Sequence, residues 1–327
     1  MDKSVIVKEK LKTIFSGENL SKVFSVASIV ILVVIFTSIN PRFIIPGNIT
    51  NILNAMAPLL AMASGVALVL MLGSVDLSIG AVVSCSAVML TVLFDEIGAA
   101  AYVVVIFFGI FAGLLNGAIH NFLKIPSFIT TLCTMSIWQS VALIVADAQP
   151  LPILPPAWPL IDWGRITFGV IPILFVVALG VNIVYTIISI KTRTGRAVLF
   201  SGSNEKAARL MGMDITRAKM TAFTLSGLSA SIAGILFSVM LRSGIPTVGD
   251  PYTLMAIASA VLGGVALSGG RGAIPMVIIG ALLINIIQNG MNVIAVDGFW
   301  QQIVFGVIVI LAIFMNSDRK TKNLIIK

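Results

Sequence analysis

The sequence predicts an all-α membrane protein that crosses the bilayer about ten times. Hydrophobic residues make up 58% of the 327 positions, charged residues make up only 10%, and the mean hydropathy is +1.08. Soluble domains carry about 25% charged residues, so this composition argues strongly against a soluble fold. The apolar residues also fall into long runs, as expected for membrane-spanning helices of about 20 residues each.

Ten apolar runs are each predicted to form a transmembrane helix. The ten runs are residues 23–39, 52–73, 78–94, 100–119, 126–147, 168–190, 220–240, 254–268, 274–295 and 300–315. The second and third runs are separated by GSVDLS (73–78). The fifth leads into the proline-rich stretch AQPLPILPPAWP (148–159), where a helix cannot continue. The eighth run is short and rich in glycine, so we expect it to be broken or to cross only in part.

Lysine and arginine residues predict the orientation, because cytoplasmic loops of membrane proteins carry an excess of them. They concentrate in an N-terminal arm (1–22), a central loop (191–219) and a C-terminal tail (316–327). Ten spans with both termini in the cytoplasm place all three segments inside, around a transmembrane domain over residues 23–315. The basic residues that fall outside are Arg42, Arg165 and Arg242. The net charge of +8 is therefore interpreted as a topology signal, and no nucleic-acid partner is expected.

Three glycines recur every four residues in the fourth run: Gly109, Gly113 and Gly117. This spacing places small residues on one face of a helix and permits close contact with another helix. We interpret the glycines as packing residues.

Four amide side chains lie in the ninth run: Asn285, Gln288, Asn289 and Asn292. Their spacing of i, i+3, i+4 and i+7 puts them on one helical face. They would be unfavourable against lipid, so this face is expected to contact protein or water. They either form hydrogen bonds between helices or line a pathway for an uncharged polar solute, since amides both donate and accept.

Asp76 and Ser78 lie in GSVDLSIG (73–80), between two predicted spans. Asp76 is interpreted first as a helix N-cap that accepts hydrogen bonds from backbone N–H groups. Ionisable residues at membrane depth are also candidates for function, and a helix break can line a cavity. Both residues are therefore candidates for the translocation pathway.

Motifs for catalysis, cofactors and metals are missing from the sequence. It lacks HExxH, GxSxG and GxxxxGK[ST], and it shows no cysteine–histidine spacing typical of a metal site. We therefore expect no enzymatic activity, no cofactor and no metal in this chain. If transport requires energy, a partner must supply it.

The stretch SGSNEKAARLMGMDITRAKM (201–220) predicts a short helix in the central loop. Ser203 or Asn204 is a suitable N-cap, Glu205 suits the positive end of a helix, and Gly212 suits its end. The intervening helix formers are Lys206, Ala207, Ala208, Arg209, Leu210 and Met211. Because two turns are too few for stability in water, this helix is expected to dock on its own spans or on another protein.

Three motifs, in order and at the expected spacing, resemble the membrane-spanning permease of bacterial ABC importers for ribose, xylose, galactose and related sugars. SNEKAARLMGM (203–213) is similar to G-N-x-E-A-A-R-L-S-G-I, with Lys206 where glutamate is usual. GSVDLSIG (73–80) is similar to G-G-I-D-L-S-V-G, and AIASAVLGGVALSGGRG (256–272) to A-I-A-A-V-V-I-G-G-T-S-L-S-G-G-R-G. The resemblance covers nearly the whole chain after about residue 25.

The resemblance implies a bacterial inner-membrane permease dimer, two cytoplasmic ATPase subunits that use ATP-Mg, and an extracytoplasmic sugar-binding protein. It also implies that the 204–212 helix is the coupling helix that contacts the ATPase. Its expected contact residues are Asn204, Glu205, Lys206, Ala207, Ala208, Arg209, Leu210 and Gly212. A role in gating or packing is expected for Gly263, Gly264, Ser268, Gly269, Gly270 and Arg271.

A monosaccharide resembling ribose is the expected cargo. A signalling sugar, a nucleoside or a branched-chain amino acid remains open, as does a carrier or channel that needs no ATPase. The sequence also departs from the family pattern Y-E-L-D-A-I-A at YTLMAIA (252–258), where Thr253 and Met255 replace two acids. The predicted topology puts this segment at the outer side. The departure fits a different docking of the binding protein, an unusual substrate or a mixed permease pair.

Overall fold

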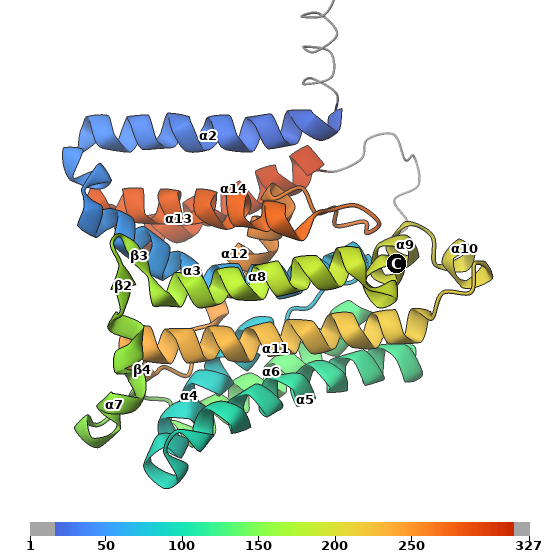
Figure 1. The fold of residues 1–327 in the computed structure, drawn as a ribbon, viewed down its shortest axis with the longest axis horizontal. Coiled ribbons are helices and arrows are strands. Elements are labelled where there is room, and N and C mark those ends of the chain that lie inside the picture. Colours follow the sequence, from blue (N-terminus) through green and yellow to red (C-terminus); the bar gives the residue numbers. More distant parts are fainter. Residues whose placement is uncertain (1–16, 317–327) are drawn as a thin grey trace, which may run out of the picture.

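The computed structural model describes residues 17–316, and nearly all of its regular structure is helical (Figure 1). The predicted arm (1–22) and tail (316–327) lie mostly outside the described residues. The long helices are α2 (Gly17–Ile39), α3 (Pro46–Met71), α4 (Ile79–Ile97), α5 (Ala100–Phe122), α6 (Ser127–Val145), α8 (Ile173–Lys191), α11 (Ile215–Leu241), α12 (Asp250–Leu262), α13 (Val277–Val293) and α14 (Gly298–Asn316).

The remaining elements are short. They are η1 (Pro41–Ile44), β1 (Leu151–Pro152), η2 (Pro155–Ala157), α7 (Trp158–Ile161), η3 (Asp162–Arg165), β2 (Thr167–Phe168), β3 (Ile171–Pro172), α9 (Arg193–Ser203), α10 (Glu205–Leu210), β4 (Ser243–Gly244) and η4 (Ile274–Met276). Strand β1 pairs antiparallel with β4, and β2 with β3. These two-residue strands lie at one end of the helical bundle, which we call the hairpin end (Figure 1). Helices α9 and α10 lie at the other, the α10 end.

Each of the ten predicted spans overlaps one long helix, so the all-α class is confirmed. Within the described residues, seven helices are long and apolar enough to cross a membrane: α3, α4, α5, α6, α8, α11 and α13 together with η4. The shorter apolar stretches are Ala27–Ile39, Asp250–Leu262 and Gly298–Leu311. Ten crossings and the orientation of the termini therefore stay predictions.

The predicted extent of the eighth run is wrong, and one helix of the central loop was not predicted. The eighth run was expected over 254–268, but α12 begins at Asp250 and ends at Leu262, where Gly263 and Gly264 begin a turn. Gly264 has φ +89°, a conformation that favours glycine. The 13 residues of α12 extend about 20 Å, less than the ~30 Å hydrocarbon core. In the central loop, α9 had not been predicted.

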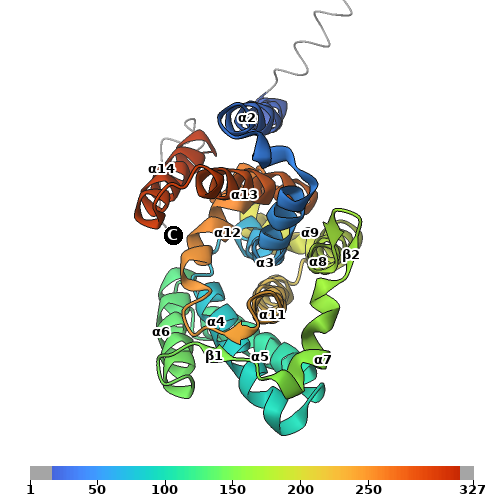
Figure 2. The same ribbon diagram turned by 90° about the vertical axis from the view of Figure 1, so that its left-hand side faces the viewer.

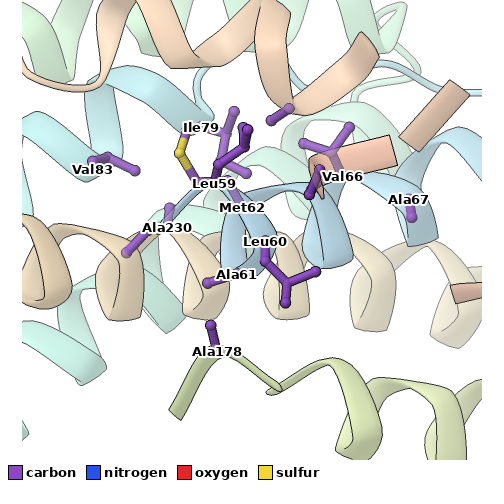
Figure 3. Close-up of a cluster of buried hydrophobic side chains, with 14 of the residues drawn as sticks. Leu59, Leu60, Ala61, Met62, Val66, Ala67, Ile79, Val83, Ala178 and Ala230 are labelled. Carbon is purple, nitrogen blue, oxygen red and sulfur yellow. The ribbon is translucent and has the colours of Figure 1, made fainter. Parts of the chain in front are cut away.

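Helix α3 lies at the centre of the bundle and contacts α8, α11, α12 and α13 (Figure 2). Every residue from Met56 to Met71 is buried, because this stretch is apolar or small on all faces. Figure 3 shows side chains of α3 meeting Ile79 and Val83 of α4, Ala230 of α11 and Ala178 of α8. This core holds the helices around which the site is built.

The glycines of α5 pack against α11, which confirms the packing interpretation. A Cβ added to Gly109 would overlap the carbonyl oxygen of Gly227, and one added to Gly113 would overlap that of Phe223. The small residues therefore let the two backbones touch.

Residues 245–249 turn back into the bundle from the hairpin end. The carbonyl oxygen of Pro246 accepts a hydrogen bond from Gln139 Nε2 (2.9 Å), and the Gly249 amide donates one to Ser84 Oγ (2.9 Å). Ser84 lies 13 residues from the hairpin end of α4 at Ile97, which is about 20 Å along the helix. Helix α12 therefore begins deep inside the bundle. Residues 252–258 therefore lie within the bundle, and their placement at the outer side of the membrane stays a prediction.

Candidate functional site

Helix α10 forms where the local sequence predicted it. Asn204 caps it, since Asn204 Oδ1 accepts a hydrogen bond from the Ala207 amide (3.0 Å). Gly212 follows the helix with φ +75°, and its amide donates to the carbonyl oxygen of Arg209 (3.0 Å). The helix buries Ala208 beneath it and leaves Leu210 with 89% of its surface exposed.

A glutamate fastens α10 to α11. Glu205 Oε1 pairs with Arg209 within the helix (3.1 Å), and Glu205 Oε2 pairs with Lys219 of α11 (3.0 Å). Partial burial of Glu205 opposes ionisation, but the hydrogen bonds and positive charges of Lys219 and Arg209 outweigh it and hold the pKa of Glu205 below its ordinary value. The carboxylate is thus charged at neutral pH and anchors the short helix.

The segment before α10 joins two other loops through backbone contacts. The Gly270 amide donates a hydrogen bond to the carbonyl oxygen of Met71 at the end of α3 (2.9 Å), and Ser203 Oγ donates one to the carbonyl oxygen of Gly270 (3.2 Å). A Cβ on Gly202 would overlap the Met71 carbonyl oxygen. We call this meeting of residues 71–74, 202–203 and 268–271 the glycine junction.

The glycine junction unites the three sequence motifs. Gly269 and Gly270 have φ +80° and +75°, and Gly73 approaches Ser268. Gly263, near the other end of this turn, lies against the backbone of Met276, where α13 is about to begin. Backbone contacts therefore join the segment before α10 to the end of α3 and to the turn between α12 and α13.

The remaining residues of the third motif lie in the same turn. Ser268 and Arg271 are exposed, and the Arg271 carbonyl oxygen accepts a hydrogen bond from the Ala266 amide (3.0 Å). Gly264 has open space where a side chain would project, but its positive φ favours glycine. These positions place the motif at the α10 end and leave its role in gating a prediction.

Asp76 and Ser78 are buried and belong to a polar network, and their role in the translocation pathway stays a prediction. Asp76 Oδ1 accepts from the Ser78 amide (3.0 Å) and from Ser78 Oγ (2.6 Å), and Asp76 Oδ2 accepts from Ser226 Oγ of α11 (2.7 Å). Asn116 of α5 donates to Ser78 Oγ, and Thr134 of α6 donates to Asn116 (both 2.7 Å). The network ties the 73–78 loop to three helices. The predicted N-cap role of Asp76 is wrong, because Ser78 occupies the N-cap position of α4 and Asp76 instead closes the turn before it through its bonds to Ser78.

The amide stripe of α13 has divided roles. Asn289 exchanges two hydrogen bonds with Asn48 of α3 (2.8 and 3.0 Å), and Asn292 accepts one from Gln301 of α14 (2.7 Å). Asn285 donates to the Ala281 carbonyl oxygen of its own helix (2.9 Å). These contacts favour the interhelical interpretation for Asn289 and Asn292.

Gln288 is the exception in this stripe. It lies beside Tyr252 of α12, and its Oε1 finds no hydrogen-bond partner among the described residues. The pathway interpretation therefore remains open at Gln288.

Sequence reasoning missed the convergence of the three motifs, and it also missed Asn116 and Thr134. Their only sequence signal was polar residues within apolar runs. Taken together, the structure is a polytopic bundle of membrane-length helices with a short exposed helix at one end, an architecture that fits the membrane-spanning subunit of a transporter.

Comparison with known proteins identifies the family. Residues 48–313 match the family described as branched-chain amino acid transport system / permease component. The chain is 34% identical to the ribose import permease protein of Bacillus subtilis (strain 168), over 89% of this chain and 90% of the relative. It is 31% identical to the ribose import permease protein of Escherichia coli (strain K12), over 90% of this chain and 94% of the relative.

A third relative is the L-arabinose transport system permease protein of Escherichia coli (strain K12), which is 34% identical over 80% of each chain. The chain belongs to this permease family of ABC importers, and it is a multi-pass membrane protein rather than an enzyme. The resemblance inferred from the three motifs is thus confirmed.

Proposed function

We propose that this chain is the permease subunit of a bacterial ABC importer and forms the translocation pathway for a monosaccharide resembling ribose. A separate ATPase that uses ATP-Mg powers the transport. The ribose and arabinose permeases among the relatives support the sugar class.

The exposed tip of α10 is the observation that carries this proposal. Leu210 and Met211 are 89% and 62% exposed, although Glu205 holds the helix in place from beneath. A short helix with apolar residues pointing away from its own protein suits a socket on another protein. The glycine junction behind it supplies a rigid route from that socket to the membrane helices.

The remaining features of the proposal follow the family. Two permeases, identical or paralogous, face each other in the bacterial cytoplasmic membrane, with the α10 end and both termini inside. An extracytoplasmic solute-binding protein delivers cargo at the hairpin end. Signalling sugars, nucleosides and branched-chain amino acids are the alternative cargoes.

Co-purification from the native membrane tests the proposal. The wild-type permease should bring an ATPase subunit with it and should import sugar in vesicles supplied with ATP. Gly212→Pro should lose the ATPase and import, because proline cannot adopt φ +75°. Arg209→Glu should do the same, because it places a second negative charge one turn from Glu205.

Gly98→Pro is the matched control. Gly98 also has a positive φ (+56°), also follows a helix and also has open space around it, but it lies in the α4–α5 turn. It should retain the ATPase. Normal import in both α10 variants would contradict the coupling role, and import without any ATPase would indicate a self-sufficient carrier.

A further inference from the structure

A cleft opens along one side of α12. It has a volume of about 640 Å³ and is lined by α12, α13 and α14. Most of the lining is apolar, including Ile284 and Phe305. Its polar members are Thr247, Asp250 and Gln302. Figure 2 shows α12 between α14 and α6.

Asp250 is exposed in this cleft at the start of α12, which lies inside the bundle and is therefore expected at membrane depth. It directly follows Gly249, whose amide bonds to Ser84 of α4, deep in the bundle. No ion pair joins Asp250 to a lysine, arginine or histidine within residues 17–316. A carboxylate facing lipid at this depth is strongly unfavourable. The backbone N–H and C=O groups of the non-helical residues 245–249 also require protein or water beside them.

The family pattern Y-E-L-D-A-I-A has its two acids at the positions of Thr253 and Met255, which follow Asp250 in α12. Position 253 faces α4, since Thr253 Oγ1 touches the space beside Gly80. Position 255 lines the cleft, and here it is Met255. With methionine at position 255, the carboxylate that lines this cleft is that of Asp250.

We propose that the Asp250 cleft is one wall of a hydrated solute pathway and that the Asp250 carboxylate binds paired hydroxyl groups of a neutral solute passing through it. This inference rests on the proposed function, since the second permease closes the open side. Two carboxylate oxygens can accept hydrogen bonds from adjacent hydroxyls at once. The same charge repels anions, so phosphorylated sugars are excluded. Thr247 and Gln302 add uncharged donors and acceptors.

Thiol labelling tests hydration and charge without knowledge of the cargo. In a Cys133→Ala background of the assembled importer, Thr247→Cys should react with water-soluble methanethiosulfonates at least about tenfold faster than Ile183→Cys, since thiolates form only in water. Ile183 is exposed in the middle of α8 and does not line the Asp250 cleft. Cys85 is buried and serves as an internal control.

The charge of the reagent then reports on Asp250. The cationic ethyltrimethylammonium reagent should react with Thr247→Cys about tenfold faster than the anionic ethylsulfonate reagent, relative to their rates with a free thiol. Asp250→Asn should abolish this preference and Asp250→Glu should keep it. An unchanged preference in Asp250→Asn, or labelling as slow as at Ile183→Cys, would overturn the proposal.

Uptake in vesicles with the same binding protein tests hydroxyl recognition. The ratio of D-ribose to 2-deoxy-D-ribose transport at saturating substrate should fall about tenfold in Asp250→Asn, which loses a charged acceptor. Asp250→Glu should largely restore it. An unaltered ratio in Asp250→Asn would overturn the hydroxyl assignment. If the wild type carries neither sugar but shows the labelling preference, the cargo in the proposed function fails while the hydrated pathway stands.

Discussion

Replacing Gly202 by alanine is the most direct perturbation of the glycine junction. Gly202 lies in the last turn of α9. A Cβ there would overlap the Met71 carbonyl oxygen and would come 2.5 Å from the Gly270 amide nitrogen. Both neighbours are backbone atoms, so neither can rotate away. The three segments of the junction must therefore separate to admit one methyl group.

The magnitude follows from three terms. Overpacking costs about 1–3 kcal/mol, and loss of the hydrogen bond between Gly270 and Met71 costs about 1 kcal/mol. Alanine recovers up to about 1 kcal/mol through its higher helix propensity. We expect a net destabilisation of about 2 kcal/mol, which for a chain of this size corresponds to a fall of about 5 °C in the unfolding midpoint.

Gly180→Ala provides the matched comparison. Gly180 is also helical, in α8, but nothing lies within 4 Å of its added Cβ. This variant should be neutral or slightly more stable. The assay follows the fraction of detergent-purified protein that stays monodisperse on heating, together with import coupled to ATP hydrolysis. For Gly202→Ala, hydrolysis should continue while import falls. Equal stability and equal import in the two variants would refute the tight junction.

Three further predictions concern other contacts. Leu210→Ser should leave thermal stability unchanged but weaken ATPase binding by roughly 10- to 100-fold in a titration, because one leucine buried on docking contributes about 1.5–3 kcal/mol. The control is Leu154→Ser, at a residue that is 52% exposed near the hairpin end. This control variant should leave ATPase binding intact. The attachment of α10 through Glu205 should be fully present above pH 4.5 and weaken as pH falls through the lowered pKa of Glu205. A spin label on α10 should report that loss as increased mobility, whereas Lys219→Met should show the mobility at every pH. Asp76→Ala removes an acceptor of three hydrogen bonds and leaves buried donors unpaired. We expect the variant to lose about 2–4 kcal/mol of stability and to give a lower yield of monodisperse protein. An unchanged yield would show that water replaces the carboxylate.

Local features were predictable from the sequence because local chemistry determines them. Apolar runs of membrane length located the long helices. The cap of α10 was predictable because Asn204 and Ala207 are separated by three positions along the chain. The glycine ridge of α5 was predictable because helical periodicity alone puts its members on one face.

Partners distant in the sequence could not be predicted in this way. Ser203 and Gly270 are 67 positions apart, and no periodic pattern links them to Met71. The amide stripe was visible as a stripe, but only the positions of α3 and α14 decided that Asn289 and Asn292 bond to other helices. Unpaired polar groups in a membrane are costly, and the fold resolves that cost by long-range pairing.

The sequence by itself determined that the chain is a helical membrane permease with a short capped helix in its central loop, because composition, run length and short motifs carry that information. Only the tertiary structure decided that the three motifs meet in one glycine junction and that α12 begins inside the bundle. The physical reason is that both features arise from backbone contacts between distant segments. Neither the close packing of the glycines nor the inward turn of residues 245–249 produces a periodic pattern in the sequence.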